Sequence, residues 1–325
     1  VMLATIREYG LDRLAVDAST ANGSPHPQQR HADYFLRLAE SAAPHLHGAT
    51  QVAWLDQLAL DHDNLRTALD WFVQTGELFK ALRLATALRY FWRVRGHYRE
   101  GCQRLLQMLA HPATAATGGP TDAVRARALN AAGYLQWVQG NTGDAQRLLQ
   151  EALTLGRTVP DAAATAFALR YLGLAADVRQ EHATAQLLLE ESLAIYRSLD
   201  FPNETALALM YLGDAALSRE SYAQAQQLYR ESVHLLRQLG NQVVLPYALR
   251  HLGYLALVQG NYQAALALCT ESLRLNLAAG EQQGGAASLA ALAAIAVANK
   301  QWAPAVRLLA SVTAWLAARD RKSVV

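Results

Sequence analysis

One spacing dominates this sequence. Gly133, Gly173, Gly213 and Gly253 follow one another at intervals of 40 residues, and a further 40 residues leads to Ala293. Three more sets recur at the same interval: Leu129, Leu169, Leu209, Leu249 and Leu289; Ala145, Ala185, Ala225, Ala265 and Ala305; and Leu148, Leu188, Leu228, Leu268 and Leu308. A fixed period in this range is the signature of stacked supersecondary units. The chain is therefore expected to form a repeat array, in which each unit packs on its neighbours.

Each unit is predicted to contain two helices. In one unit the apolar residues Leu249, Leu252 and Leu255 recur at helical spacing, and Gly260-Asn261 is a signal for a helix end and a turn. A second apolar stripe follows at Tyr262, Ala265, Leu266, Cys269, Ser272 and Leu273. Small residues in both helices, such as Gly253 and Ala265, are expected to let the two backbones approach closely.

These residues resemble a tetratricopeptide repeat. The resemblance is carried by Leu252-Gly253, Gly260-Asn261-Tyr262, Ala265 and Ser272-Leu273. It implies an all-α fold, a right-handed superhelical solenoid of helix-turn-helix repeats. The usual unit of that family has 34 residues, and the extra residues are expected in loops between repeats, near 158–161, 201–205, 241–246 and 282–285. The sequence departs from the family where Ala176, Ala216 and Ala256 replace a frequent tyrosine, and where Gln180 and Glu220 replace the turn glycine.

Composition agrees with a helical, non-membrane protein. Of the 325 residues, 52% are hydrophobic and only 9 are proline, which favours helices over sheets. The net charge of +2 comes without a long run of either sign, so direct nucleic-acid binding is not expected. Two distant cysteines imply no disulfide framework and fit a reducing cytoplasm. The most apolar run, 286–298, is too short to span a bilayer.

Ahead of the regular repeats the chain is less periodic. Helices are expected over 2–15, 30–43, 51–60 and 81–94, with a loop over 17–29. Residues 81–109 align with the regular units and are expected to form a degenerate repeat. The predicted organisation is N-terminal helices over 1–76, a degenerate repeat and loop over 77–122, five repeats over 123–319, and a tail over 320–325.

The N-terminal stretch carries a second resemblance. The segments Thr5-Ile6-Arg7-Glu8-Tyr9, Asp63-Asn64-Leu65-Arg66 and Arg95-Gly96-His97 are similar to the region that follows the nucleotide-binding and winged-helix modules of bacterial STAND-class ATPase regulators, which include AfsR-like and LuxR-type transcription factors. The resemblance implies that residues 1–76 hold the end of a winged-helix-like module and linker helices. It also implies that the chain is the sensor and interaction arm of a larger regulator.

Motifs for catalysis are not found. The sequence has no Gly-x-x-x-x-Gly-Lys-Ser/Thr loop for ATP and no Gly-x-Ser-x-Gly elbow. Asp61, Asp63 and Asn64 lack the glycine and glutamate of a calcium loop, and His45 with His47 would leave zinc short of ligands. No catalytic residue, metal or cofactor is therefore predicted. The expected function is a non-enzymatic scaffold that binds a protein, a peptide or a small-molecule effector. The alternatives are the effector arm of a DNA-binding regulator, with DNA contacts outside this chain, and an enzyme.

A binding groove is predicted on the first helices of the repeats, which line the concave side in such superhelices. Its candidate residues are Asn130, Tyr134, Trp137, Phe167, Arg170, Asp177, Met210, Asp214, Tyr247, Arg250 and Tyr254. Guanidinium groups beside aromatic faces suit a carboxylate-bearing peptide or effector. The competing interpretation is an ordinary helix surface on which Arg170 pairs with Asp177 or Asp214.

The last repeat is expected to pack its apolar face against a further partner. Its second helix carries Val306, Leu309, Val312, Trp315 and Leu316. Terminal repeats need a polar outer face for solubility. This end is therefore predicted either to meet another module or to self-associate.

Overall fold

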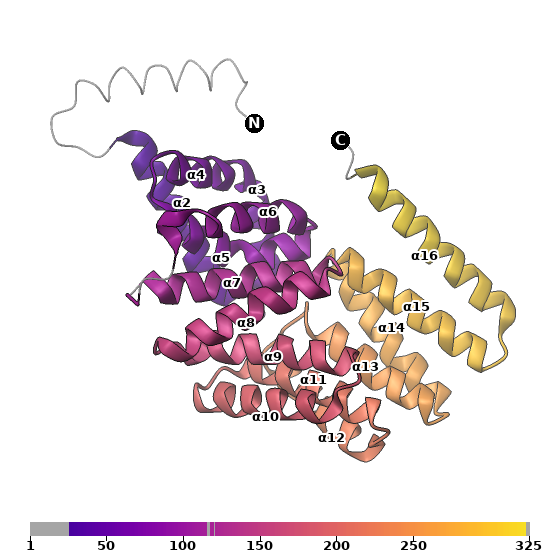
Figure 1. Ribbon diagram of the computed structural model, residues 1–325. Coiled ribbons are helices and arrows are strands. Elements are labelled where there is room, and N and C mark those ends of the chain that lie inside the picture. The colour runs from indigo at the N-terminus through magenta and orange to yellow at the C-terminus, as the bar shows by residue number, and fades with distance from the viewer. Residues whose placement is uncertain (1–25, 116–117, 120, 323–325) are drawn as a thin grey trace.

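The fold is an array of α-helices. The computed structural model describes residues 26–115, 118–119 and 121–322, and every regular element in these ranges is helical (Figure 1). The array starts with α2 (Pro27–His45), α3 (Gln51–Leu60) and α4 (His62–Gln74). The helix expected over 2–15 and most of the loop after it lie outside the described residues. No helix within the described ranges has the length and apolar character needed to cross a membrane.

The remaining helices form six consecutive pairs. They are α5 (Leu78–Arg95) with α6 (Tyr98–Leu109), α7 (Thr121–Val138) with α8 (Thr142–Thr158), α9 (Ala162–Val178) with α10 (His182–Ser198), α11 (Pro202–Ser218) with α12 (Tyr222–Gln238), α13 (Leu245–Val258) with α14 (Tyr262–Ala278), and α15 (Gln282–Ala298) with α16 (Trp302–Lys322). A short 3-10 turn, η1 (Pro112–Thr114), follows α6. Each pair packs on the next. The first helices of successive pairs also touch one another, so these helices form a continuous inner wall.

The extra residues of most units lie in the helices. Each helix from α9 to α12 has 17 residues, and the connections between them, such as 179–181 and 199–201, have three. The expectation that inter-repeat loops hold the extra residues is therefore wrong for these units, but the connection 239–244 before α13 has six residues and overlaps the expected loop 241–246. Segments 202–205 and 282–285 are the first turns of α11 and α15. A longer helix satisfies its backbone groups internally and extends the packed face, whereas a longer loop would do neither.

A left-handed backbone conformation ends the first helix of each regular unit. Gly140 and Gly260 have φ of 84° and 75°, and three other residues at the same place in the repeat take the same region: Gln180 at 63°, Glu220 at 59° and Lys300 at 58°. The turn geometry is therefore kept although the glycine is not. A side chain in this region costs roughly 1–2 kcal/mol, which the surrounding packing must offset.

The repeated glycines mark the close approach of the two helices in a unit. A Cβ built on Gly133 or Gly173 would lie 2.8 Å from Cγ of Leu149 or Leu189. At Gly213 it would lie 2.6 Å from Cε1 of Tyr229. Because ordinary carbon contacts are about 3.5–4.0 Å, these positions exclude a side chain, and the predicted role of the 40-residue glycine pattern is confirmed.

Two sets of polar contacts repeat with the same period. Ser192 and Ser232 in second helices donate hydrogen bonds of 2.8 and 2.7 Å to the carbonyls of Ala166 and Ala206 in the first helices. On the outer surface each second helix is ion-paired to the next. These pairs are Arg157–Glu191 at 3.3 Å, Arg197–Glu231 at 2.7 Å and Arg237–Glu271 at 3.0 Å. The periodic sequence therefore specifies both the buried and the exposed contacts between units.

The N-terminal helices pack back against repeats far along the chain. The connection 46–50 meets the one between α12 and α13, where Asn241 Nδ2 donates to the carbonyl of His47 at 3.3 Å. From α5, Arg93 donates to the Tyr247 hydroxyl at 3.0 Å. Val243 and Ala279 share one apolar core with α2–α7. The inner wall is therefore faced by N-terminal elements.

Candidate functional site

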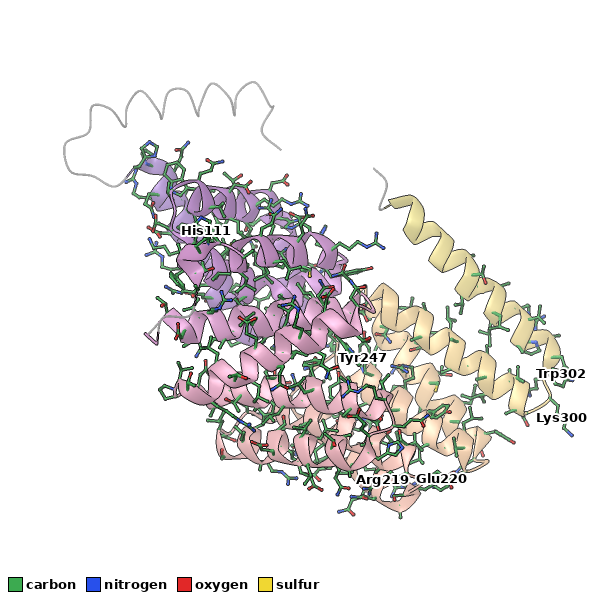
Figure 2. All side chains as sticks on the ribbon, in the orientation of Figure 1. His111, Arg219, Glu220, Tyr247, Lys300 and Trp302 are labelled. Atoms are coloured by element: carbon green, nitrogen blue, oxygen red, sulfur yellow. The ribbon has the colours of Figure 1, made fainter. Side chains whose placement is uncertain are left out.

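A narrow cavity lies where the N-terminal elements face the inner wall. Its volume is about 80 Å³. Residues from α5, α7, α9, α11, α13 and the connections before α3 and α13 line it: His47, Arg89, Tyr90, Arg93, Tyr134, Phe167, Arg170, Tyr171, Glu204, Leu207, Met210, Tyr211, Val244 and Tyr247. Figure 2 labels Tyr247, which lies near the middle of the molecule between the N-terminal half and the last repeats. We call this space the central cavity.

Helix periodicity and the 40-residue repeat together bring these side chains to one place. Arg89 and Arg93 are one turn apart on α5, so they lie on the same face. Phe167, Leu207 and Tyr247 occupy equivalent positions in successive units. Tyr171 and Tyr211 form a second equivalent set, one helical turn after Phe167 and Leu207. Stacking the units therefore builds a mostly aromatic wall.

Arg170 is the most deeply buried cation of this wall. Its side chain is 1% exposed and forms an ion pair with Glu204. The guanidinium also lies 5.2 Å from the ring centroids of Phe167, Tyr171 and Tyr196. Burial raises the pKa of Glu204, but Arg170 and His47 lower it, and the net shift is downward. The predicted pairing of Arg170 with Asp177 or Asp214 is wrong, because Glu204 from the next unit is closer to the guanidinium.

Arg93 ties α5 to the distant repeats. Besides its bond to Tyr247, its guanidinium lies 5.0 Å from the Tyr90 ring and 3.9 Å from the carboxylate of Glu281. Glu281 is 2% exposed and accepts hydrogen bonds from the Tyr247 hydroxyl and from the backbone of Gly284. A buried charge needs such partners, since leaving one unpaired is costly.

Arg89 has a different environment. It is half-buried, donates to the carbonyl of Thr86 at 3.3 Å, and stacks over the Phe167 ring at 5.3 Å. None of the ion pairs found among the described residues involves it. Burial lowers the pKa of His47 to about 4, so that imidazole is neutral at pH 7. The cavity therefore presents three guanidinium groups, of which only Arg93 and Arg170 are ion-paired to a carboxylate, although the charge of Arg89 also helps to lower the pKa of Glu204.

Several buried polar atoms around the cavity lack a hydrogen-bond partner within the described protein. They are Tyr90 Oη, Arg93 Nε, Arg170 Nε and His47 Nδ1. Buried polar groups are almost always satisfied in folded proteins, so a cluster of exceptions requires an explanation. These atoms are covered by neighbouring protein atoms, so they mark polar side chains that are held around the cavity without a full set of hydrogen bonds.

The structure brings together five of the eleven predicted groove residues: Tyr134, Phe167, Arg170, Met210 and Tyr247. The others lie elsewhere. Asn130 is buried and donates to the carbonyl of Ala164 at 2.8 Å, and Trp137 is half-buried against the apolar core. Asp177 contacts His182 at 3.2 Å, while Asp214 accepts from Tyr229 and His251, each at 2.6 Å. Arg250 lies over the Tyr247 ring at 5.7 Å, and Tyr254 is 52% exposed.

The cavity residues outside the prediction come from three places. Arg89, Tyr90 and Arg93 belong to the degenerate unit, whose Gly96 precedes Gly140 by 44 residues, so a strict 40-residue register misplaces them. Regular units supply Tyr171 and Tyr211, which directly follow the predicted Arg170 and Met210, together with Leu207, Glu204 and Val244. His47 lies in the connection 46–50, outside the repeats. The recurrence of aromatic residues at Phe167, Tyr171, Tyr211 and Tyr247 was a signal that could have found part of this wall.

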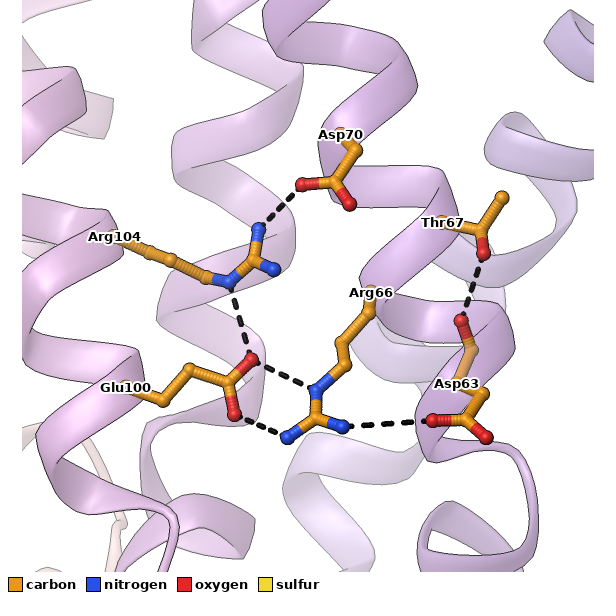
Figure 3. A network of polar contacts seen from close by, with 6 residues as sticks. All are labelled: Asp63, Arg66, Thr67, Asp70, Glu100 and Arg104. Carbon is orange, nitrogen blue, oxygen red and sulfur yellow. Dashed lines mark hydrogen bonds and ion pairs between the residues drawn. The ribbon is translucent and has the colours of Figure 1, made fainter.

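A second polar cluster joins α4 to α6. His62, His97 and Glu100 place one ligand atom each within 4.8 Å of one another, a spacing that a metal ion could use. Figure 3 shows, however, that Glu100 accepts from Arg66 through both oxygens and from Arg104 at 3.2 Å. The guanidinium groups already neutralise this carboxylate and would repel a cation. The arrangement is an ion-pair network that holds α4 against α6.

The comparisons with known proteins agree with this architecture. Residues 124–198 match the family model described as tetratricopeptide repeat. The array is a tetratricopeptide-repeat solenoid. In a crystal structure of a Rap protein complexed with competence and sporulation factor, the same fold is found with a TM-score of 0.64 and 13% identity, over 94% of this chain and 77% of that one. A structure of NprR with its cognate peptide NprX gives a TM-score of 0.58 and 14% identity, over 80% and 76%.

Two further similarities concern larger regulators. A STAND protein with a tetratricopeptide-repeat sensor from Pyrococcus horikoshii matches with a TM-score of 0.55 and 11% identity, over 82% of this chain and 42% of that protein. Candidate HTH-type transcriptional regulators of Mycobacterium tuberculosis and Mycobacterium bovis are 32% identical over 167 residues, half of this chain. The chain covers only 18% of the length of these mycobacterial relatives.

Proposed function

We propose that this tetratricopeptide-repeat chain is the sensing arm of a bacterial transcriptional regulator and binds its effector in the central cavity. The proposal is carried by the cavity itself. Helix α5, the connection 46–50 and several repeats build it jointly, and aromatic side chains and three arginines line it. The arm is non-enzymatic and acts in the cytoplasm. DNA contact and nucleotide hydrolysis belong to other modules of the regulator.

The relatives support this assignment. The mycobacterial proteins are described as HTH-type transcriptional regulators, and the structures with the same fold show Rap complexed with competence and sporulation factor and NprR with its cognate peptide. A solenoid repeat domain positions a binding surface and supplies no catalytic group of its own.

The position of the cavity suggests how binding is transmitted. An occupant would touch α5 on one side and α9, α11 and α13 on the other. It would therefore favour the arrangement in which N-terminal elements and distant repeats are packed together. A ligand shifts an equilibrium by its difference in affinity for the two states, so binding would bias the N-terminal elements towards one orientation.

Filling the cavity tests the proposal. Leu207→Trp places a larger side chain in the cavity, and Leu187→Trp is the matched control on α10, where Leu187 is 67% exposed. The measurement is effector-dependent transcription by the parent regulator, together with the melting temperature of the 325-residue chain. The Leu207 variant is expected to lose the response while the chain stays folded, and the control is expected to keep it. A full response from a folded Leu207→Trp protein would refute the proposal.

A further inference from the structure

The central cavity combines a positive charge with aromatic walls. We propose that its ligand is a small carboxylic acid with an apolar body, and that Arg89 and Arg93 hold the carboxylate. This inference rests on the proposed function and adds the chemical class of the effector. It follows from the charge balance, the apolar walls and the size of the site.

The charge balance favours an anion. Arg170 has Glu204 as its partner and Arg93 has Glu281, but Arg89 contacts only a carbonyl and an aromatic face. One more negative charge would give each guanidinium a carboxylate. Guanidinium forks bind carboxylates through two parallel hydrogen bonds, which makes them selective for this group.

The donors converge on the same region. Arg89, Tyr90 and Arg93 follow one another on one face of α5, and Tyr90 is 8% exposed. Tyr90 Oη and Arg93 Nε have no hydrogen-bond partner within the described protein, but both atoms are covered by neighbouring atoms, and Arg93 lies near enough to the phenol to lower its pKa. The carboxylate would therefore lie between the guanidinium groups of Arg89 and Arg93, which line the cavity. Burial still raises the pKa of Tyr90 far above its usual value, so the phenol adds no negative charge to the site at any physiological pH.

The walls require an apolar body. Phe167, Tyr171, Tyr211, Leu207 and Met210 face the cavity and offer mainly ring faces and aliphatic carbon. A fully hydrated dianion such as phosphate would gain little from these surfaces and would lose its hydration. A monocarboxylate with a short aliphatic body satisfies both the charge and the walls.

The volume limits the length of the ligand. About 80 Å³ has room for about five water-sized groups at 15 Å³ each. An extended peptide of six residues is about 20 Å long and would not fit. Of the expected ligand classes, a small-molecule effector of a few carbon atoms fits this cavity, whereas an extended peptide does not.

Matched acids and amides test the inference on the whole 325-residue chain. Isothermal titration would compare butyrate with butyramide, propionate with propionamide, and inorganic phosphate. Each acid–amide pair has the same shape and differs in charge. At least one acid is expected to bind saturably and about tenfold or more tightly than its amide, because the hydrogen bonds to the arginines are charge-assisted. Phosphate is expected to bind more weakly than that acid.

Variants locate the binding site. Arg89→Gln is expected to weaken acid binding about tenfold or more, and it breaks no ion pair. Arg83→Gln is the control on the same helix, since Arg83 pairs with Glu40 on the surface and does not line the cavity. The inference fails if no acid binds, if an amide binds as well as its acid, if phosphate binds as well as the best acid, or if Arg89→Gln has no effect.

This failure can be distinguished from failure of the proposed function. If the acids do not bind but Leu207→Trp abolishes the regulator's response, the cavity is the sensing site and only the ligand class is wrong. If the acids bind but Leu207→Trp leaves the response intact, the cavity is an anion site without a sensing role.

Discussion

Arg170 shows how the surroundings decide the role of a single residue. The sequence places it in a column of exposed-looking positions on the first helices, but its guanidinium is enclosed by three aromatic rings and paired with Glu204. Removing one member of a buried ion pair leaves the other charge unpaired, which costs about 3–5 kcal/mol.

Arg170→Ala and Glu204→Ala are therefore each expected to lower the free energy of unfolding by roughly 3–5 kcal/mol. Arg170→Met combined with Glu204→Leu is expected to cost less than the sum of the single changes, because neither charge remains. Urea denaturation of the wild type and the variants measures this. Single variants as stable as the wild type would show that the pair is not buried in solution.

Two histidines give the stability a pH dependence. Burial is the main cause that lowers the pKa of both His47 and His62 from 6.5 to about 4. Between these values the unfolded chain binds protons that the folded chain does not. The contribution of the two histidines to the free energy of unfolding is therefore expected to be fully present above pH 6.5. It is expected to fall as the pH drops towards 4, by at most about 1.4 kcal/mol per pH unit for each histidine.

Urea midpoints at pH 7.0 and 5.0 check this expectation. His47→Gln and His62→Gln should each reduce the difference between the two midpoints. The exposed His234 provides the control, and His234→Gln should leave the difference unchanged. An equal loss of stability in all variants would assign the pH dependence to other groups.

At the scale of the element, the turn between paired helices carries conformational strain. Glu220 is exposed and has φ of 59°, a region that glycine adopts without cost. Glu220→Gly is expected to raise the free energy of unfolding by about 0.5–1 kcal/mol, after the greater freedom of glycine in the unfolded chain is subtracted. Gln227→Gly, in the interior of α12, should instead lower it by about 1 kcal/mol. Thermal unfolding distinguishes the two, and destabilisation by both would contradict the strain argument.

Where the two helices of a unit are in close contact, replacing glycine by a larger residue is expected to lower the stability. Gly213→Ala would place its Cβ 2.6 Å from the Tyr229 ring, so it is expected to destabilise the protein by about 1–3 kcal/mol. Gly143, near the start of α8, has no atom within 4 Å of a built Cβ. Gly143→Ala should therefore stabilise by about 0.4–1 kcal/mol. Calorimetric melting temperatures of the two variants should move in opposite directions, and a shift in the same direction would argue against close helix contact.

At the scale of the whole molecule, the two ends of the array differ. The N-terminal helices fold back onto distant repeats, whereas α16 lies at the far edge, beside α15 (Figure 1). Its exposed face carries Trp302, Val306 and Leu309, which are 63%, 67% and 49% exposed and recur at helical spacing. The side chain of Trp315, which was predicted to share this face, lies outside the described side chains.

This apolar stripe is expected to drive self-association of the 325-residue chain. Sedimentation velocity over a dilution series should show a concentration-dependent shift, which Val306→Glu with Leu309→Glu removes. Leu187→Glu is the control at an isolated exposed leucine on α10. A wild-type chain that stays monomeric at several hundred micromolar would exclude self-association through this helix.

The sequence alone determined the repeat architecture. The 40-residue recurrence of glycine, alanine and leucine predicts paired helices, their close approach and their stacking, because each of these depends on neighbours in the chain or in the next unit. It also predicts the first-helix wall and five of the residues that line the central cavity.

Only the tertiary structure decided where the central cavity lies and which charged side chains form ion pairs around it. The cavity depends on α5 and the connection 46–50 meeting α11 and α13, contacts that span more than 100 residues and follow no period. The partner of Arg170 is likewise set by the rotation between successive units. A local periodic pattern specifies how each unit packs on the next, but the closure of the array depends on the sum of those rotations, which no single repeat encodes.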